Sequence, residues 1–200
     1  MQILNTVSNG MKRYANKRYI IPLLIILVII LVLMDQGPFG TAKLKEMSGG
    51  LGTLDMQFGY SAAHTYGLFE KIGSSGRLLY DKLLGLDFLF AFFYMILQSL
   101  LITVLMKKAK LSVRWEKLNL LPILRSALDM VENCLLIFLI ASFPEQHTVV
   151  VFIASFITIV KLSINYGYIA LVFFLGVLTT RQSVNAKIEK QKLCNTGKAV

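Results

Sequence analysis

Four stretches of the chain are dominated by apolar residues and are separated by more polar connections. They cover residues 19–34, 83–106, 120–143 and 148–178. A helix needs about 20 predominantly apolar residues to cross the hydrocarbon core of a bilayer. The pattern predicts an all-α, polytopic membrane protein with four transmembrane helices in a bundle and short outer interfacial helices between spans one and two.

The first stretch is short for a span, because only residues 20–34 are strictly apolar. The preceding sequence MKRYANKR followed by an apolar run also fits the first two regions of a signal peptide. The sequence that follows, MDQGPFG, has no small-x-small cleavage motif. We therefore predict an uncleaved signal-anchor helix over residues 19–34 rather than a cleaved signal peptide.

Composition supports a membrane location, since 56% of the residues are hydrophobic and the mean hydropathy is +0.64. These values exceed those of ordinary soluble domains. The formal net charge of +10 is also compatible with nucleic-acid binding. Membrane proteins, however, gather Lys and Arg on their cytoplasmic side. The position of the charges decides between these readings.

Basic residues concentrate in three segments, residues 1–18, 107–119 and 179–200, whereas residues 35–82 hold five basic and five acidic residues. The positive-inside rule then predicts both termini in the cytoplasm and residues 35–82 outside. We expect the membrane to be the plasma membrane. Basic residues near the surface also attract anionic lipids. We expect membrane lipids as partners and no nucleic acid.

The predicted outer segment, residues 35–82, has three parts. Its Gly-rich residues 37–55 predict a loop. The sequence YSAAHTYGLFEKIG predicts a short helix with Ser61 as N-cap and Gly73 as the terminating residue. A second helix then runs from Gly76 through span two to Met106, a length of about 46 Å at 1.5 Å per residue.

Polar residues recur along one side of each of spans two, three and four. In span three these residues fall within a sector of about 100°. Since lipid penalises charged side chains, these faces are expected to turn inward against one another. We call this predicted set the polar seam: Tyr80, Asp87, Tyr94 and Gln98 in span two; Arg125, Asp129, Glu132 and Asn133 in span three; Thr158, Lys161, Asn165 and Tyr168 in span four.

Two ion pairs are expected within the polar seam. Glu132 and Lys161 lie near the middle of their spans, which predicts a pair between helices, and Arg125 is spaced to compensate Asp129 four residues later. Tyr94 and Gln98 lie near the middle of span two and are expected at the same level. Buried polar residues can serve only to fix helix register, or they can form a functional site, and both possibilities stay open.

The sequence offers few signs of disulfide, metal-binding, redox or catalytic motifs. Cys134 and Cys194 match no disulfide, metal or redox spacing. His64 has no second ligand residue at a suitable distance on its helix, and Arg77 and Tyr80 are further outer-face candidates. No P-loop, HExxH motif or nucleophile elbow occurs in the sequence. We therefore predict no metal site and no cofactor.

One pattern resembles a known family. Gly73-x-x-Gly76-Arg77-x-x-Tyr80, followed by Asp87 and Tyr94 and by Asp129-x-x-Glu132-Asn133, is similar to a family of small four-helix integral membrane proteins with no assigned activity. The similarity covers roughly residues 55–178. It implies that the polar seam and the Gly-Arg turn belong together, and it implies no substrate or mechanism.

Three functions are compatible with the sequence. The first is an accessory, regulatory or interaction protein, with a protein partner or a homo-oligomer. The second is an outward-open protein that binds or transports a small polar or amphipathic ligand. The third is an intramembrane lipid-modifying enzyme that uses Asp129 or Glu132 as a general acid or base. A cavity that reaches the polar seam would favour the second or third function, whereas a dry, close-packed seam would favour the first.

Overall fold

The computed structural model describes residues 2–111 and 113–196, and 86% of the chain is helical. No strand occurs in these ranges. The all-α prediction is therefore confirmed. The elements in chain order are α1 (Gln2–Tyr14), α2 (Lys17–Gln36), α3 (Thr41–Met47), the 3₁₀ helix η1 (Leu54–Met56), α4 (Ala62–Lys108), the 3₁₀ helix η2 (Val113–Leu120), α5 (Leu121–Ser142) and α6 (Thr148–Thr196).

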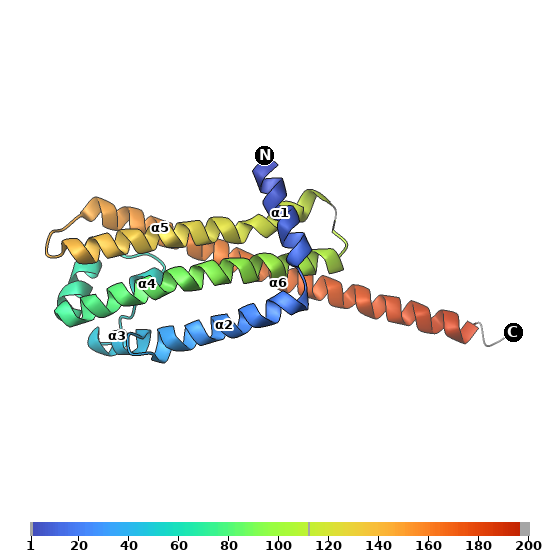
Figure 1. The fold of residues 1–200 in the computed structure, drawn as a ribbon, viewed down its shortest axis with the longest axis horizontal. Coiled ribbons are helices and arrows are strands. Elements are labelled where there is room, and N and C mark those ends of the chain that lie inside the picture. Colours follow the sequence, from blue (N-terminus) through green and yellow to red (C-terminus); the bar gives the residue numbers. More distant parts are fainter. Residues whose placement is uncertain (1, 112, 197–200) are drawn as a thin grey trace.

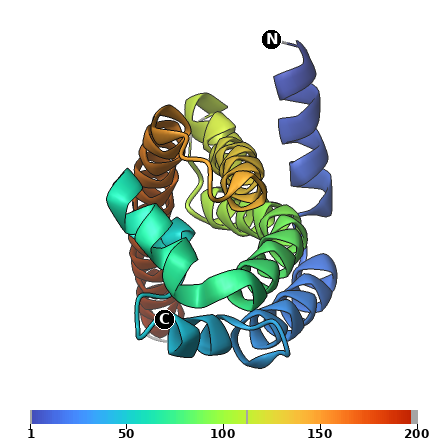
Figure 2. The ribbon, with the colours of Figure 1, turned by 90° about the vertical axis from the view of Figure 1, so that its left-hand side faces the viewer.

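The long helices form a curved row in the order α2, α4, α5, α6 (Figure 2). Helix α5 packs against both α4 and α6, and α4 and α6 also contact each other directly. Helix α2 packs against α4 and α3. Among the described residues, α2 and α6 share no extensive contact, so the row stays open between these two helices at its ends. The first turns of α4 and the segment around α3 lie across one end of this row (Figure 2).

Helices α2, α4 and α6 are each long and apolar enough to cross a membrane. Many of the exposed side chains on α2 are apolar, which is typical of a lipid-facing helix. These residues are Ile21, Leu24, Ile25, Val28, Ile29, Leu31, Val32 and Leu33. Helix α5 has 22 residues but carries Arg125, Asp129 and Glu132, so it falls outside that group of three.

The loop expected over residues 37–55 is partly wrong, because α3 forms within it. Its sequence TAKLKEM consists mostly of strong helix formers. The buried side chain of Leu44 anchors the helix to the core. Gly49 and Gly50 then adopt positive φ values of 63° and 97°, which end the helix in a turn that favours glycine. Tertiary packing therefore stabilises a short helix between glycines.

The break between the two outer helices lies where the sequence predicts it. Ser61 is the N-cap of α4, and its Oγ accepts a hydrogen bond of 3.2 Å from the His64 backbone N–H. Gly73 has φ 63° and ψ −172°, a conformation essentially restricted to glycine, and α4 turns sharply there. The first part of α4 can therefore fold back over the end of the row of helices.

Both ends of the chain contain more helix than the sequence analysis expected. Residues 2–14 form α1, and α6 continues to Thr196, far beyond its apolar part (Figure 1). The Lys107 Nζ donates to the Lys12 carbonyl at 2.6 Å, and the Gln182 Nε2 donates to the Ala109 carbonyl at 3.3 Å. The three basic segments thus meet at one end of the row of helices. Which side of a membrane this end faces stays a prediction.

Candidate functional site

A network of buried charges joins α5 and α6. The Lys161 Nζ lies 2.5 Å from Glu132 Oε2 and 2.6 Å from Asp129 Oδ1, and the Arg125 Nη1 lies 2.9 Å from Asp129 Oδ2. Asp129, Glu132 and Lys161 are each at most 2% exposed. Both predicted ion pairs are therefore confirmed. The second partner of Lys161, Asp129, was not foreseen.

The network continues towards the outer segment through hydroxyl groups. Thr158 donates to Glu132 in a short hydrogen bond, and the hydroxyls of Thr158 and Tyr60 lie 3.4 Å apart. The Tyr60 backbone N–H donates to Ser155 Oγ at 2.9 Å. Burial raises the pKa of the Tyr60 phenol well above its ordinary value, so this hydroxyl stays protonated and able to donate.

The rest of the polar seam separates into layers on either side of this network. On the outer side, Asn133 Nδ2 donates to Asp87 Oδ2 at 2.7 Å. On the inner side, Gln98 Nε2 donates to Asn165 Oδ1 at 3.3 Å, and Tyr168 donates to the Gln98 carbonyl at 3.0 Å. The expectation that Gln98 meets Glu132 and Lys161 is therefore wrong, because its partners lie on α6 one turn or more further in.

Tyr94 also differs from the expectation. Its ring lies 5.3 Å from the Arg125 guanidinium carbon, a cation–π distance, rather than beside Glu132. Arg125 is thus held between the Asp129 carboxylate and an aromatic face. With Lys161 on the other oxygen of Asp129, both cations of the site have partners.

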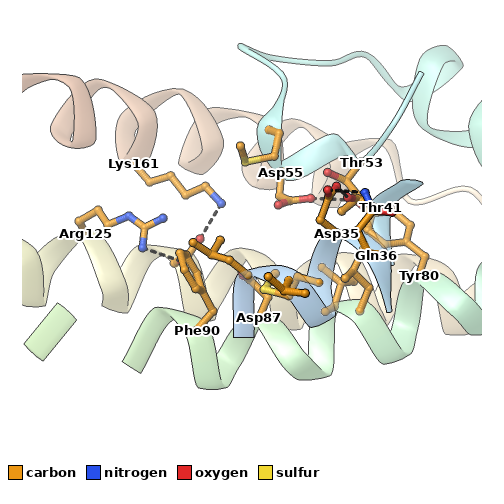
Figure 3. Close-up of a pocket in the computed structure, with 17 residues that line it drawn as sticks. Asp35, Gln36, Thr41, Thr53, Asp55, Tyr80, Asp87, Phe90, Arg125 and Lys161 are labelled. Carbon is orange, nitrogen blue, oxygen red and sulfur yellow. Dashed lines mark hydrogen bonds and ion pairs between the residues drawn. The ribbon is translucent and has the colours of Figure 1, made fainter. Parts of the chain in front are cut away.

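A cavity of about 510 Å³ lies between α2, α4, α5 and α6 (Figure 3). This volume falls within the range of small-molecule sites. Its inner wall includes Arg125, Asp129 and Lys161, and its outer wall includes Asp55 from η1. The cavity thus reaches from the outer segment to the buried charge network.

The walls of the cavity are mainly apolar. Leu83, Leu84 and Phe90 of α4 line it together with Leu31 and Val32 of α2. Leu31, Val32 and Met56 are 49%, 57% and 73% exposed although they line the cavity, so they mark its mouth. A mouth that includes exposed apolar side chains of α2, a helix apolar enough to cross a membrane, suits access from a bilayer.

The charges of the cavity are unevenly distributed. At the inner end, Arg125 and Lys161 neutralise Asp129 and Glu132. The outer part contains the carboxylates of Asp35, Asp55 and Asp87. Among the described residues, no basic side chain forms an ion pair with any of these three. The outer part of the cavity therefore carries an excess of negative charge.

Tyr80 fixes the outer wall. Its side chain is fully buried, its hydroxyl accepts a hydrogen bond of 2.8 Å from the Leu54 backbone N–H, and it donates to Asp55 Oδ1 at 3.3 Å. Tyr80 therefore joins η1 to α4 and orients Asp55. This residue was expected as an outer-face candidate, and the structure brings it to the cavity.

The other two outer-face candidates do not line the cavity. Arg77 Nη1 donates to the Phe69 carbonyl at 2.9 Å, and its guanidinium carbon lies 4.3 Å from the Phe143 ring centre. It thus supports the bend at Gly73, where carbonyls of the first helical segment lose their usual partners. His64 is half-buried, and its Nε2 has no hydrogen-bond partner among the described residues.

Sequence reasoning placed several residues at the site that the structure places beside it. The lining contains Tyr80, Asp87, Arg125, Asp129 and Lys161, whereas these others lie outside it: Tyr94, Gln98, Glu132, Asn133 and Asn165. The sequence did not point to four other lining residues, Asp35, Thr53, Asp55 and Phe90. Asp55 had one usable signal, since it is an acidic residue at the end of a Gly-rich segment that the sequence placed next to a helix.

No known family model, curated protein or solved structure matches the chain. The chemistry of the site therefore has to be read from its own residues. They offer an apolar cavity, unpaired carboxylates at the outer end and neutralised charges at the inner end. Within the described residues, no three His, Cys, Asp or Glu side chains are grouped so that they could hold a metal ion.

Proposed function

We propose that this chain is an integral membrane protein that binds an amphipathic small molecule in the cavity between α2, α4, α5 and α6. The observation that carries the proposal is the cavity of about 510 Å³, which joins an apolar mouth to buried charged side chains. An amphipathic molecule matches this combination, because its chain can cover apolar walls while its polar group meets the carboxylates. Membrane lipids are the proposed source of such molecules.

The proposed arrangement has four crossings, with α5 as the fourth. Helix α5 spans about 33 Å at 1.5 Å per residue, close to the thickness of the hydrocarbon core. Its charged residues face the bundle, whereas Leu124, Val131 and Phe138 are exposed. The distribution of basic residues supports cytoplasmic termini, with the cavity reached from the outer half. A plasma membrane is the proposed location.

The alternatives receive less support. A seam that only fixes helix register needs no cavity beside it. Catalysis by Asp129 or Glu132 would need a free acid or base facing substrate, but both carboxylates are held by Lys161 and Glu132 does not line the cavity. A protein partner or a homo-oligomer stays a prediction.

The proposal can be tested by narrowing the mouth from its exposed side. Val32 is exposed and lines the cavity, so Val32→Trp should reduce ligand access with little effect on folding. Val28 lies one turn earlier on α2, is 51% exposed and does not line the cavity, which makes Val28→Trp the matched control.

The measurement is photolabelling of the purified protein in lipid nanodiscs with a dodecyl alcohol that carries a diazirine. We expect labelling of the α2 and α4 peptides that contain Leu31 and Leu84, at similar levels in the natural protein and in Val28→Trp. Val32→Trp should lose most of it. Equal labelling of Val32→Trp, or labelling spread over all exposed helix faces, would contradict a binding cavity.

A further inference from the structure

The cavity has a chemical preference that follows from Asp87. This side chain is 7% exposed, lines the cavity and accepts one hydrogen bond, from Asn133. No cation among the described residues pairs with it. A buried carboxylate without a cation is disfavoured and tends to take up a proton, so a positive group that entered the cavity would be stabilised beside it.

The nearby cations are not available to fill this role. Lys161 bridges Asp129 and Glu132, and Arg125 pairs with Asp129. If Lys161 or Arg125 moved towards Asp87, a buried carboxylate that it now pairs with would lose a cation. A cationic partner for Asp87 would therefore have to come from outside the chain.

The surroundings of Asp87 favour an organic cation. Asp55 lines the same cavity from η1, and its Oδ1 accepts a hydrogen bond from Tyr80. The rings of Tyr80 and Phe90 are part of the same wall, and aromatic faces attract ammonium groups. The described residues also form no cluster of three potential metal ligands. A protonated amine fits this set of partners better than a bare metal ion does.

The remaining wall defines the rest of the molecule. Around the carboxylates, the wall of the cavity includes Leu83, Leu84 and Phe90, and its mouth includes Leu31 and Val32. These residues suit an alkyl chain that leaves the cavity between α2 and α6, where the row of helices is open. The ammonium end would then lie at the outer carboxylates and the chain would point to the lipid.

We propose that the cavity binds membrane-dissolved amphiphiles whose polar end is a protonated amine, with Asp87 and Asp55 as its carboxylate partners. This inference rests on the proposed function, since it assigns the ligand class of the same cavity. An anionic headgroup is disfavoured, because it would face three carboxylates before it reached Arg125 or Lys161.

The test compares three probes that share a dodecyl chain: dodecylamine, dodecanol and dodecanoate. Each competes with the photoreactive dodecyl alcohol for labelling of the cavity peptides in nanodiscs at neutral pH. We expect dodecylamine to compete at roughly tenfold lower concentration than dodecanol, the difference typical of one charge-assisted hydrogen bond. Dodecanoate should be the weakest competitor.

The variants assign the preference to named residues. Asp87→Asn should bring dodecylamine to the level of dodecanol, and Asp55→Asn gives a second variant if Asp87→Asn folds poorly. Asp81→Asn is the matched control, because Asp81 lies on the same helix and does not line the cavity. The control should keep the full preference for the amine.

The outcomes separate this inference from the proposed function. If dodecanol competes as well as dodecylamine, or dodecanoate competes best, the cavity binds amphiphiles but the amine assignment is overturned. If the amine preference survives in both Asp87→Asn and Asp55→Asn, the assignment to these carboxylates is overturned. If none of the probes displaces the label from the cavity peptides, the proposed function itself fails.

Discussion

The inner and outer ends of the cavity differ in how their charges are compensated. At the inner end, Lys161 and Arg125 face Asp129 and Glu132 at distances of 2.5–2.9 Å. At the outer end, the hydrogen-bond donors to Asp87 and Asp55 among the described residues are neutral, namely Asn133 and Tyr80. Carboxylates that form ion pairs within the chain can hold helices together, whereas carboxylates without a cation can accept one from a ligand. The two ends should therefore respond differently to the same kind of substitution.

The largest effect is expected at Lys161, because one cation serves two buried carboxylates. Lys161→Met should leave Glu132 without a cation and Asp129 with Arg125 alone. Breaking a buried ion pair by removing one partner costs about 3–5 kcal/mol. Thermal unfolding of the purified protein in detergent should therefore shift strongly to lower temperature.

A control keeps the charge while it changes the shape. Lys161→Arg should recover part of the lost stability, since a guanidinium can still reach both carboxylates. Unfolding of Lys161→Met at the temperature of the natural protein would show that the inner charges do not stabilise the bundle.

A direct comparison of the two ends comes from removing one carboxylate charge from each. Asp129→Asn should destabilise the protein by about 1.5–3 kcal/mol, because hydrogen bonds to charged groups contribute about that much. Asp87→Asn should leave stability unchanged or raise it, since Asn can accept the same hydrogen bond from Asn133 without an uncompensated charge. Unfolding in detergent without added amphiphile measures both. Equal destabilisation by the two substitutions would remove the distinction between the ends.

Much of the inner end could be predicted from the sequence, because it depends on regular spacing. The interval between Arg125 and Asp129 places them one turn apart on a helix, and the apolar spans around Glu132 and Lys161 set their depth in the bundle. Helix periodicity also gave the N-cap at Ser61, and the glycine pattern gave the break at Gly73. These features depend on neighbouring residues or on the helical repeat of one segment.

The outer end could not be predicted in the same way. Asp55 reaches the cavity because η1 is tied to α4 by Tyr80, which is 26 residues from Leu54 in the sequence. No periodic pattern links an irregular segment to a helix that follows it. The open edge between α2 and α6 was equally hidden, because four apolar spans are compatible with a closed bundle as well as with an open row.

The smallest effect is expected in the innermost layer, where Gln98 and Asn165 share a neutral hydrogen bond of 3.3 Å between α4 and α6. Gln98→Leu should cost about 0.6 kcal/mol, the average for such bonds between membrane helices, and Asn165→Leu about the same. The double substitution should cost less than the sum of the two, because each single change already breaks the bond. Neither change should alter amphiphile binding, since neither residue lines the cavity. A loss of binding in Gln98→Leu would mean that the functional region extends inward past Lys161, and the division between a structural inner end and a ligand-binding outer end would then have to be abandoned.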